Sequence, residues 1–475
     1  MKTRNLKLKI ISKGSLLIPI IIFSSIALII MSGIMNWAKI TIQTNRDMLV
    51  RERAIQLAES GIDYYRWHLA HNKTDFQDGT ESPGPYVHQV YDKDGNVVGE
   101  FSLSITPPLI GSTKVRIEST GIPVGSAVSR KIRVEMGIPS MAKYAMVTNS
   151  VVYYGSGDEV FGPVHSNVGV GFLNGSPQPI AHNLVTSATQ TFSGKFGVYT
   201  TVPPADPNPP ASVPNRPDVF QSGRQFPVPA VDFTGITNDL SNIKADAIAN
   251  GFYRASSGVN GYKIVLKTSG SFDLYKVNSL LPTPQNCAYG QTGWGTWSIN
   301  TVSGATTLLG NYAFPANGLI FLEDHIWVEG QIDGARLTIV AAKFPINSAT
   351  YKNIIVNNNL SYTHFDGTDV IGLIAQGNFL VGMAGANNLT IDAAIIAQNG
   401  QTIRYYYSSN CSPWTYRSTL TTYGMFASNG QGYFYYGNSG YTSQPASYDA
   451  NLLYGPPPSF PLTSDQYEIL SWEEI

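Results

Sequence analysis

Charged residues are scarce in this 475-residue chain. Asp, Glu, Lys and Arg make up 13% of it, against roughly 25% in an average soluble domain. The 31 basic and 32 acidic residues leave a net charge of −1, so nothing suggests nucleic acid as a partner. The chain is rich instead in glycine, proline and tyrosine, with 45, 29 and 27 residues, which favours many short strands joined by tight turns.

Cysteine is almost absent, and the two residues present, Cys287 and Cys411, stand far apart. Because there is no CxxC pair and no Cys/His cluster, we expect no structural zinc site. Nothing else in the sequence calls for a metal or a cofactor. In an oxidising compartment the two cysteines would close a disulfide, and the alternative is two separate half-buried thiols. The sequence leaves both open.

The motifs of common catalytic sites are missing too, since there is no GxSxG, P-loop or HExxH and no GxGxxG between a strand and a helix. Glycan cleavage needs paired carboxylates. The candidate pairs lie in turn-like segments that favour solvated acids: Asp324 with Glu323 and Glu329, and Asp366 with Asp369. Other candidates for a base or a metal ligand lack the partners that such a site needs, a second ligand for a histidine and alternating acids for a calcium loop. They are His165, His325, His364, and Asp158 with Glu159. We therefore expect no enzyme.

One long apolar run is present, at residues 14–38, and it contains no charged residue. At about 1.5 Å per residue its helix would measure about 37 Å, enough to cross a hydrocarbon core of about 30 Å. A secretory signal peptide is the competing interpretation, but the run is too long and no small-x-small cleavage site follows it. The sequence predicts one transmembrane helix, whose residues include Leu16, Pro19, Ile30 and Trp37.

The helix is predicted to continue to about His71, because apolar residues recur along one face at helical spacing: Ala54, Ala58, Gly61, Ile62, Tyr65 and Leu69. Four segments with β-branched or aromatic alternation follow, at 86–91, 97–106, 113–120 and 128–136. Glycines at 111 and at 121–125 are interpreted as turns between them. Residues 14–72 thus form a long helix, and residues 73–137 form a small antiparallel sheet that covers its second half.

The segment RERAIQLAESGI, at 51–62, resembles the helix of PilX-type minor pilins and of the tip pseudopilins of type II secretion. Lys13-Gly14-Ser15-Leu16-Leu17 resembles their prepilin leader junction. The resemblance implies that a prepilin peptidase cuts between Gly14 and Ser15, and that the membrane and other pilin-like subunits are partners. Major pilins carry Glu at the fifth mature position, where this chain has Pro19. This departure favours a subunit at the end of a filament, and it leaves open whether the leader is cut.

The remaining residues are expected to form a mainly β body. Its parts are a first β segment at 138–200, a Pro-rich connector with one helix at 201–260, and strands with a C-terminal cap at 261–475. Similar segments begin at Leu373, Ile395 and Met425, spaced by 22 and 30 residues, and such repeats are typical of solenoids. We predict a right-handed parallel β-helix, with a β-sandwich as the alternative. The tail is interpreted as a cap because Pro456, Pro457 and Pro458 cannot extend a ladder.

Aromatic residues gather in Gly-, Ser- and Asn-rich segments of the body. Such clusters suit contact with a protein or a surface glycan, and the alternative is aromatic ladders along the exterior. The residues are Trp294, Trp297, Tyr405, Tyr406, Tyr407, Trp414, Tyr416, Tyr433, Phe434, Tyr435, Tyr436 and Tyr441.

The function predicted from these features is that of a PilX-type minor pilin-like structural subunit. It would cross the cytoplasmic membrane once, with residues 1–13 inside as a leader, although lysine and arginine are nearly balanced across the apolar run. The body would lie outside or at a pilus tip, for assembly, adhesion or surface contact. The alternatives are a membrane-anchored adhesin outside any filament and a carbohydrate-active β-helix enzyme.

Overall fold

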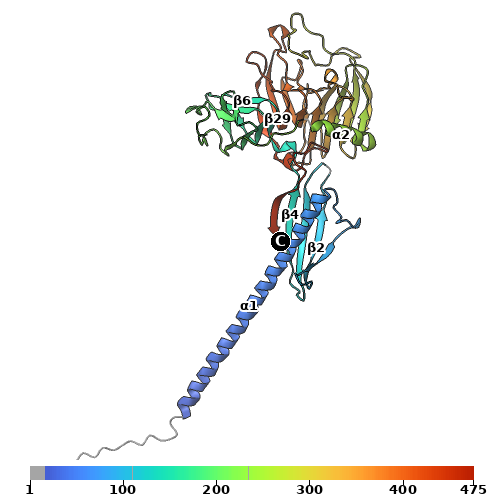
Figure 1. Cartoon of the computed structure of the whole chain (residues 1–475). Helices are drawn as coiled ribbons and strands as arrows, with labels where there is room; N and C mark the ends of the chain where they lie inside the picture. The colour runs from blue at the N-terminus through green and yellow to red at the C-terminus, as the bar shows by residue number, and fades with distance from the viewer. Residues whose placement is uncertain (1–16, 110, 234) are drawn as a thin grey trace, which may run out of the picture. The chain divides into compact units, whose positions relative to one another are not determined.

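The computed structural model describes residues 17–109, 111–233 and 235–475 and divides into two units (Figure 1). We call the unit that contains the N-terminal helix and a five-stranded sheet the helix–sheet module. The unit that contains residues 107–115 and 136–470 is the body. The predicted combination of a long helix, a small antiparallel sheet and a mainly β body is confirmed. The predicted leader junction at Gly14, Ser15 and Leu16 lies outside the described residues.

Helix α1 runs from Leu17–His71 over 55 residues. Pro19 stands in its first turn, where a missing backbone N–H costs little. The second half of the helix has one buried face: Ala54, Leu57, Ala58, Gly61, Ile62, Tyr65 and Leu69. Between Leu17 and Leu49, by contrast, the large apolar side chains are exposed, including Ile30 and Trp37. Half of α1 is therefore packed and half is bare.

The sheet of the module consists of β1 (Tyr86–Tyr91), β2 (Val97–Thr106), β3 (Val115–Pro123), β4 (Arg130–Gly137) and β32 (Glu468–Glu474), in that order. β1 pairs with β2 and β2 with β3, both antiparallel. Burial alternates along the strands, as expected for a sheet with one covered face. The residues buried with the packed face of α1 include Phe101, Leu103, Ile117, Ile132 and Val134.

Gly121 corrects one sequence interpretation, because it lies inside β3 rather than in a turn. A Cβ atom there would come within 2.1 Å of the Ala54 carbonyl oxygen and 2.5 Å of the Ala58 nitrogen, both in α1. Gly61, on α1, is similarly close to β3, since its Cβ would lie 2.3 Å from Ser119 Oγ. These glycines let helix and sheet approach closely.

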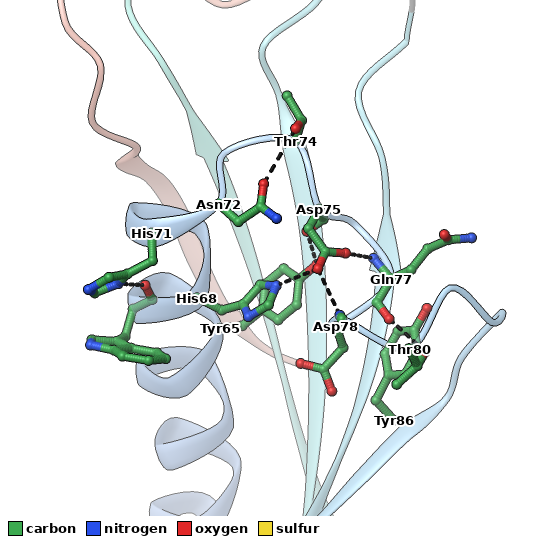
Figure 2. Close-up of polar contacts among 12 residues, drawn as sticks. Tyr65, His68, His71, Asn72, Thr74, Asp75, Gln77, Asp78, Thr80 and Tyr86 are labelled. Atoms are coloured by element: carbon green, nitrogen blue, oxygen red, sulfur yellow. Dashed lines mark hydrogen bonds and ion pairs between the residues drawn. The ribbon is translucent and has the colours of Figure 1, made fainter.

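The loop after α1 is held against the helix by a compact polar cluster (Figure 2). Asp75 accepts hydrogen bonds from the backbone N–H groups of Gln77 and Gly79, both at 2.8 Å, and its Oδ2 lies 3.1 Å from His68 Nε2. These contacts lower the pKa of Asp75, the Gln77 N–H most of all. The Tyr65 hydroxyl donates to the Asp75 carbonyl at 2.9 Å. The end of α1 is thereby tied to the loop that leads to β1.

The C-terminal tail does not cap the strand ladders as expected. Its last strand, β32, lies beside β4 in the module, where Arg133 Nη1 is 3.0 Å from Glu473 Oε1. The proline run lies along the side of the body: Thr338 Oγ1 donates to the Pro458 carbonyl, and Arg336 Nη2 donates to the Pro456 carbonyl at 2.7 Å. The tail strand therefore completes the sheet of the module. The local sequence does not reveal this pairing.

A parallel ladder of ten strands forms the backbone of the body. Its order in space is β16 (Phe252–Arg254), β20 (Leu319–Leu322), β22 (Arg336–Ala341), β25 (Val370–Ala375), β27 (Asn388–Ala397), β29 (Tyr416–Ser428), β5 (Met146–Thr148), β8 (Val164–Ser166), β11 (Val185–Ser187) and β15 (Arg224–Gln225). We call it the first ladder. The chain therefore starts in its middle, at β5, and runs out to β15. It then restarts at the other end with β16 and returns to β29.

Two shorter ladders accompany the first. The second contains β17 (Tyr262–Lys267), β21 (Ile326–Gln331), β23 (Ile354–Ile355), β26 (Phe379–Leu380) and β28 (Thr402–Ile403), and continues as a bridge to Tyr433. The third links β24 (Leu360–Ser361) to parts of β21, β27 and β29, then to β30 (Gly440–Ser443) and β31 (Ala446–Tyr448). The antiparallel strands β18 (Ser271–Val277) and β19 (Thr306–Ala313) extend β17.

Successive chain segments thus pair in parallel on several faces around one apolar core. We interpret this arrangement as a β-solenoid, because a β-sandwich is built mainly from antiparallel neighbours. Its right-handedness stays a prediction. The observed register pairs Leu373 with Ile395, as the spacing of 22 predicts, but it pairs Ile395 with Phe426 rather than with Met425. A shift of one residue exchanges the faces of a strand, so Met425 lies in the core under α2 instead.

Helix α2 (Ile236–Asn250) lies where the sequence predicts a helix, and it covers the outer face of the first ladder. Leu240, Ile243 and Ala247 pack there with residues such as Phe321 and Ile374. The first-ladder strands β20 and β25 are therefore buried on both faces, which explains their nearly continuous apolar sequences. The described part of the body also contains short 3-10 helices: η1 (Met141–Lys143), η2 (Ser348–Thr350), η3 (Ser409–Cys411) and η4 (Ala450–Leu453).

Residues 145–228 form a lobe with its own apolar core, which we call the small lobe. Besides β5, β8, β11 and β15 it contains β6 (Val151–Tyr154), β7 (Glu159–Val160), β9 (Gly169–Phe172), β10 (Ile180–Ala181), β12 (Thr191–Phe192), β13 (Lys195–Phe196) and β14 (Val198–Thr200). The Pro-rich segment belongs to this lobe rather than connecting two domains, because Asp206 is buried and accepts from both Arg224 and the Thr200 N–H. The buried ion pair between Asp206 and Arg224 therefore holds in the small lobe a segment whose composition is typical of a connector.

Candidate functional site

A cleft opens between the small lobe and the rest of the body, which we call the large lobe. The first ladder continues across the boundary from β29 to β5. The second ladder ends at Tyr433, whereas β6 begins a separate three-stranded sheet with β9 and β14. Within residues 17–109, 111–233 and 235–475, no strand pairing joins that end to β6. Figure 1 shows β6 and β29 on either side of this boundary.

The cleft has a volume of about 860 Å³, within the range of roughly 300–1,000 Å³ usual for ligand sites. Inward-facing residues of β29, such as Leu420, Thr422 and Phe426, line its interior. Aromatic side chains stand on both walls, and four of them are 38–50% exposed: Tyr153 and Phe161 on the small lobe, and Tyr433 and Tyr435 on the large lobe. Such rings offer both apolar area and, for tyrosine, a hydroxyl.

The charged residues that line the cleft are both acidic, Asp158 and Glu159. Burial raises the pKa of Asp158, although the Gly155 N–H donates to its Oδ2 at 2.6 Å. Glu159 Oε2 lies 3.2 Å from His182 Nε2. No lysine or arginine is among the described lining residues, so the cleft favours a neutral or cationic ligand over an anionic one.

The sequence identified part of this cleft. Tyr433, Phe434 and Tyr435 belong to the predicted aromatic cluster and do line it. Tyr153 and Phe161 were missed, although the segment 151–161, VVYYGSGDEVF, places three aromatics and two acids beside turn glycines. That composition is the available signal, but nothing local indicates that the segment faces residues 433–435.

The candidate carboxylate pairs are held in separate structural contacts, and the interpretation as solvated turn acids is wrong for Asp324. Asp324 is buried and accepts from Ser257 N at 2.9 Å and from Lys352 Nζ at 3.0 Å. Burial opposes ionisation there, but the Ser257 and Lys352 contacts outweigh it and lower the pKa of Asp324. Glu323 binds Lys244 Nζ at 2.6 Å, and Glu329 binds Lys263 Nζ at 2.7 Å.

The acids of the second candidate pair also make structural contacts. Asp369 is buried and accepts from the backbone N–H groups of Ala335, Thr363 and His364. Asp366 is exposed and accepts from Thr368 Oγ1 at 2.6 Å. The interpretation of this pair as solvated turn acids is therefore wrong for Asp369. Its carboxylate accepts hydrogen bonds from backbone N–H groups in a turn, in place of backbone carbonyl oxygens.

The singled-out histidines also have structural roles. His165, in β8, is buried between Thr186 Oγ1 and Asn167 Oδ1, each at 2.9 Å, and burial lowers its pKa. Burial likewise lowers the pKa of His325 to about 4, and its Nδ1 accepts from the Asn353 N–H. The described residues hold no group of three or more His, Cys, Asp or Glu arranged to bind a metal.

Cys287 and Cys411 form a disulfide in the structure, with Cα atoms 4.8 Å apart. The bond lies in an apolar layer on the outer face of the second ladder, against Trp327, Ile355 and Leu380. Several predicted aromatics belong to this layer and are packed rather than offered to a ligand: Trp294, Trp297, Tyr405, Tyr407 and Trp414. The disulfide joins the two covering segments, around residues 280–299 and 405–414.

Asp392 leads to a prediction about pH. It is buried in β27, accepts from the Tyr362 N–H at 3.1 Å, and has a pKa raised to about 6 by burial and, less strongly, by Asp449. A carboxyl whose folded pKa exceeds its unfolded value stabilises the fold below about pH 4, and this contribution is lost as pH rises through 6. We expect the Asp392→Asn variant to equal wild type at pH 4 and to be about 1–3 kcal/mol more stable at pH 7.5. Urea unfolding of both proteins at both pH values measures the free energy of unfolding. An equal loss of stability between pH 4 and pH 7.5 in wild type and variant would contradict the prediction.

Helix α1 is the second candidate site. It is long and apolar enough to cross a membrane, with a mean hydropathy of 2.5 over its best window and none of that window buried. Ile40, Ile42, Met48 and Leu49 continue the exposed apolar surface beyond residue 38. Among the residues that the structure describes, none covers this part of the helix.

The likeness of this chain to known proteins is distant. No family model and no curated protein matches the sequence. Among solved structures, the crystal structure of the competence-associated pilin ComZ from Thermus thermophilus aligns over 90% of this chain and 97% of its own, with 14% sequence identity and a TM-score of 0.36. A score this low carries no functional assignment.

Proposed function

We propose that this protein is a pilin-like subunit of a type IV pilus or pseudopilus, of the PilX-type minor class. In this proposal α1 anchors the chain in the cytoplasmic membrane and packs among other pilin-like helices, while the body is presented outside. The observation that carries the proposal is the bare, apolar half of α1, next to a half that is packed on its own sheet.

The length of the bare half of α1 supports the proposal quantitatively. From Leu17 to Leu49 the helix spans about 50 Å at about 1.5 Å per residue, against a hydrocarbon core of about 30 Å. About 20 Å of helix with exposed apolar side chains therefore extends past the lipid. Met48 and Leu49 lie in that part of the helix and are exposed. A simple tether would gain nothing from them, whereas a bundle of similar helices would bury them.

The chain path is consistent with an assembly subunit that carries an added body. The chain leaves the sheet at β4 and returns 330 residues later at β32, its neighbour in the sheet. The sheet of the module is therefore complete although the chain of the body is inserted between two of its neighbouring strands. Pro19, which has no carboxylate to offer a neighbouring subunit, supports a position at a filament end.

Processing of the leader tests this function directly. In cells with a prepilin peptidase we expect mass spectrometry to find a mature chain that begins at Ser15 with a methylated amine. Deleting Gly14 should leave the full-length precursor. A precursor of unchanged length, with and without the peptidase, would count against processing.

The bare helix gives a second test. Replacing Met48 and Leu49 together by asparagine should lower the amount of protein in sheared filaments by about tenfold or more. Their side chains are about 60% exposed, so folding of the module should not change. Glu52→Gln, one turn further along and also exposed, is the matched control and should assemble normally. If the double variant assembled like wild type, or wild type labelled the cell surface evenly and was absent from filaments, the anchored-adhesin alternative would be favoured.

A further inference from the structure

The small lobe presents an unpaired strand edge at the cleft. β6 pairs with β9 on one side, and within the described parts of the chain it has no strand on the other. The Leu173 N–H donates to the Tyr154 carbonyl at 2.8 Å, which places the backbone groups of Tyr154 on the β9 side. Because these groups alternate along a strand, the N–H and C=O of Tyr153 point away from β9.

This edge is short, since β6 has four residues, but it has no side chain or bulge that would prevent another strand from joining it. Protected edges carry lysine, proline or a bulge, whereas β6 reads Val-Val-Tyr-Tyr and pairs with β9 in continuous register. Val152, Tyr153 and Tyr154 line the cleft. The edge therefore offers free backbone groups inside a preformed cavity, the arrangement that proteins use to bind extended peptides.

The side-chain chemistry narrows the partner further. Tyr433 and Tyr435 stand on the opposite wall and provide aromatic area beside the edge. Asp158 and Glu159 follow β6 in the chain, and they are the charged residues of the lining. A strand that enters here would meet rings along its length and negative charge at one end.

We propose that the cleft binds an extended segment of another protein, which adds as a strand along β6 and places a lysine or arginine side chain near Asp158 and Glu159. This role goes beyond the filament function and does not depend on it. The aromatic walls alone would also suit a neutral glycan. The free backbone edge favours a peptide, because a sugar has no need of an in-register row of N–H and C=O groups.

Fluorescence polarisation on the full-length protein in detergent micelles tests the proposal. The probes are fluorescein-labelled ten-residue peptides of alternating threonine and valine, with lysine, arginine, glutamine or glutamate at a central position. We expect the lysine and arginine peptides to bind at least tenfold more tightly than the glutamate peptide. A lysine peptide with alternate backbone amides N-methylated should not bind, because it cannot form the ladder. Equal binding of the methylated peptide, or no binding of any peptide up to millimolar concentration, would overturn the proposal.

Two substitutions at one position separate the backbone from the ring. Tyr153→Pro removes the free N–H without removing a β6–β9 hydrogen bond, whereas Tyr153→Ala removes the ring and keeps the N–H. We expect the proline variant to lose at least tenfold in affinity and the alanine variant to stay within about threefold of wild type. Circular dichroism and melting of both variants check that the lobe is folded. Glu159→Gln should reduce the preference for lysine over glutamate.

The carbohydrate alternative has a distinct outcome. Maltohexaose would compete with the peptide probe, and the alanine and proline variants would lose affinity equally, because both lack the ring. That result would assign the cleft to a neutral sugar and overturn the peptide proposal.

Discussion

Replacing Cys287 and Cys411 together by serine should lower the free energy of unfolding of the body by about 4 kcal/mol. The bond closes a loop of 124 residues, and the chain-entropy model gives about 5 kcal/mol for such a loop, while native disulfides typically contribute about 2–5 kcal/mol. The bond also holds the aromatic layer over Trp327 and Leu380, so its loss should expose that face of the second ladder. Guanidinium unfolding followed by tryptophan fluorescence measures the change, because Trp294, Trp297 and Trp414 lie in this layer.

Reduction provides the control for this variant. Wild type in dithiothreitol should unfold at the same denaturant concentration as the double serine variant, and the variant should not respond to the reductant. A double variant as stable as oxidised wild type would show that packing of the two segments suffices without the covalent link.

Gly121→Val should separate α1 from the sheet and cost about 3 kcal/mol or more. Over-packing usually costs about 1–3 kcal/mol, and here the new Cβ would meet the Ala54 carbonyl oxygen and the Ala58 nitrogen. These are helix backbone atoms, which cannot rotate away as a side chain would. We expect faster proteolysis between residues 50 and 71 and loss of the cooperative unfolding of the module.

The neighbouring residue supplies the matched control for Gly121. Thr120→Val adds the same side chain one position earlier, on the opposite face of β3, and should change stability by less than about 0.5 kcal/mol. Equal protection of α1 from protease in both variants would mean that the helix adapts to the added volume and that the close approach at Gly121 is not required.

Local patterns predicted the module well. The apolar stripe from Ala54 to Leu69 and the alternation in the four strands arise from periods of 3.6 and 2, which any short window of sequence carries. Helix α1 ends at His71 as predicted, and β1 and β2 have the predicted bounds. Gly121 was misinterpreted for a physical reason. A turn glycine and a glycine under a helix look alike in sequence, and only the position of Ala54 across the interface distinguishes them.

Long-range pairing produced the larger differences. The tail strand β32 joins β4, more than 300 residues earlier, and β5 pairs not only with nearby β8 but also with β29, from the other end of the body's sequence. The Pro-rich segment was interpreted as a connector because its composition is typical of one, yet Asp206 and Arg224 bury it in the small lobe. No local propensity encodes which strand edge another segment will meet.

The sequence by itself determined the apolar helix, its packed stripe and the short-strand character of the body, since each depends on residue type and spacing alone. The tertiary structure decided that the body is inserted between two neighbouring strands of the module. It also decided that the two cysteines meet and that Tyr153 faces Tyr433 across a cleft beside a free strand edge. The physical reason is that strand neighbours, and the gaps left between them, are set by how distant segments bury their surfaces against one another.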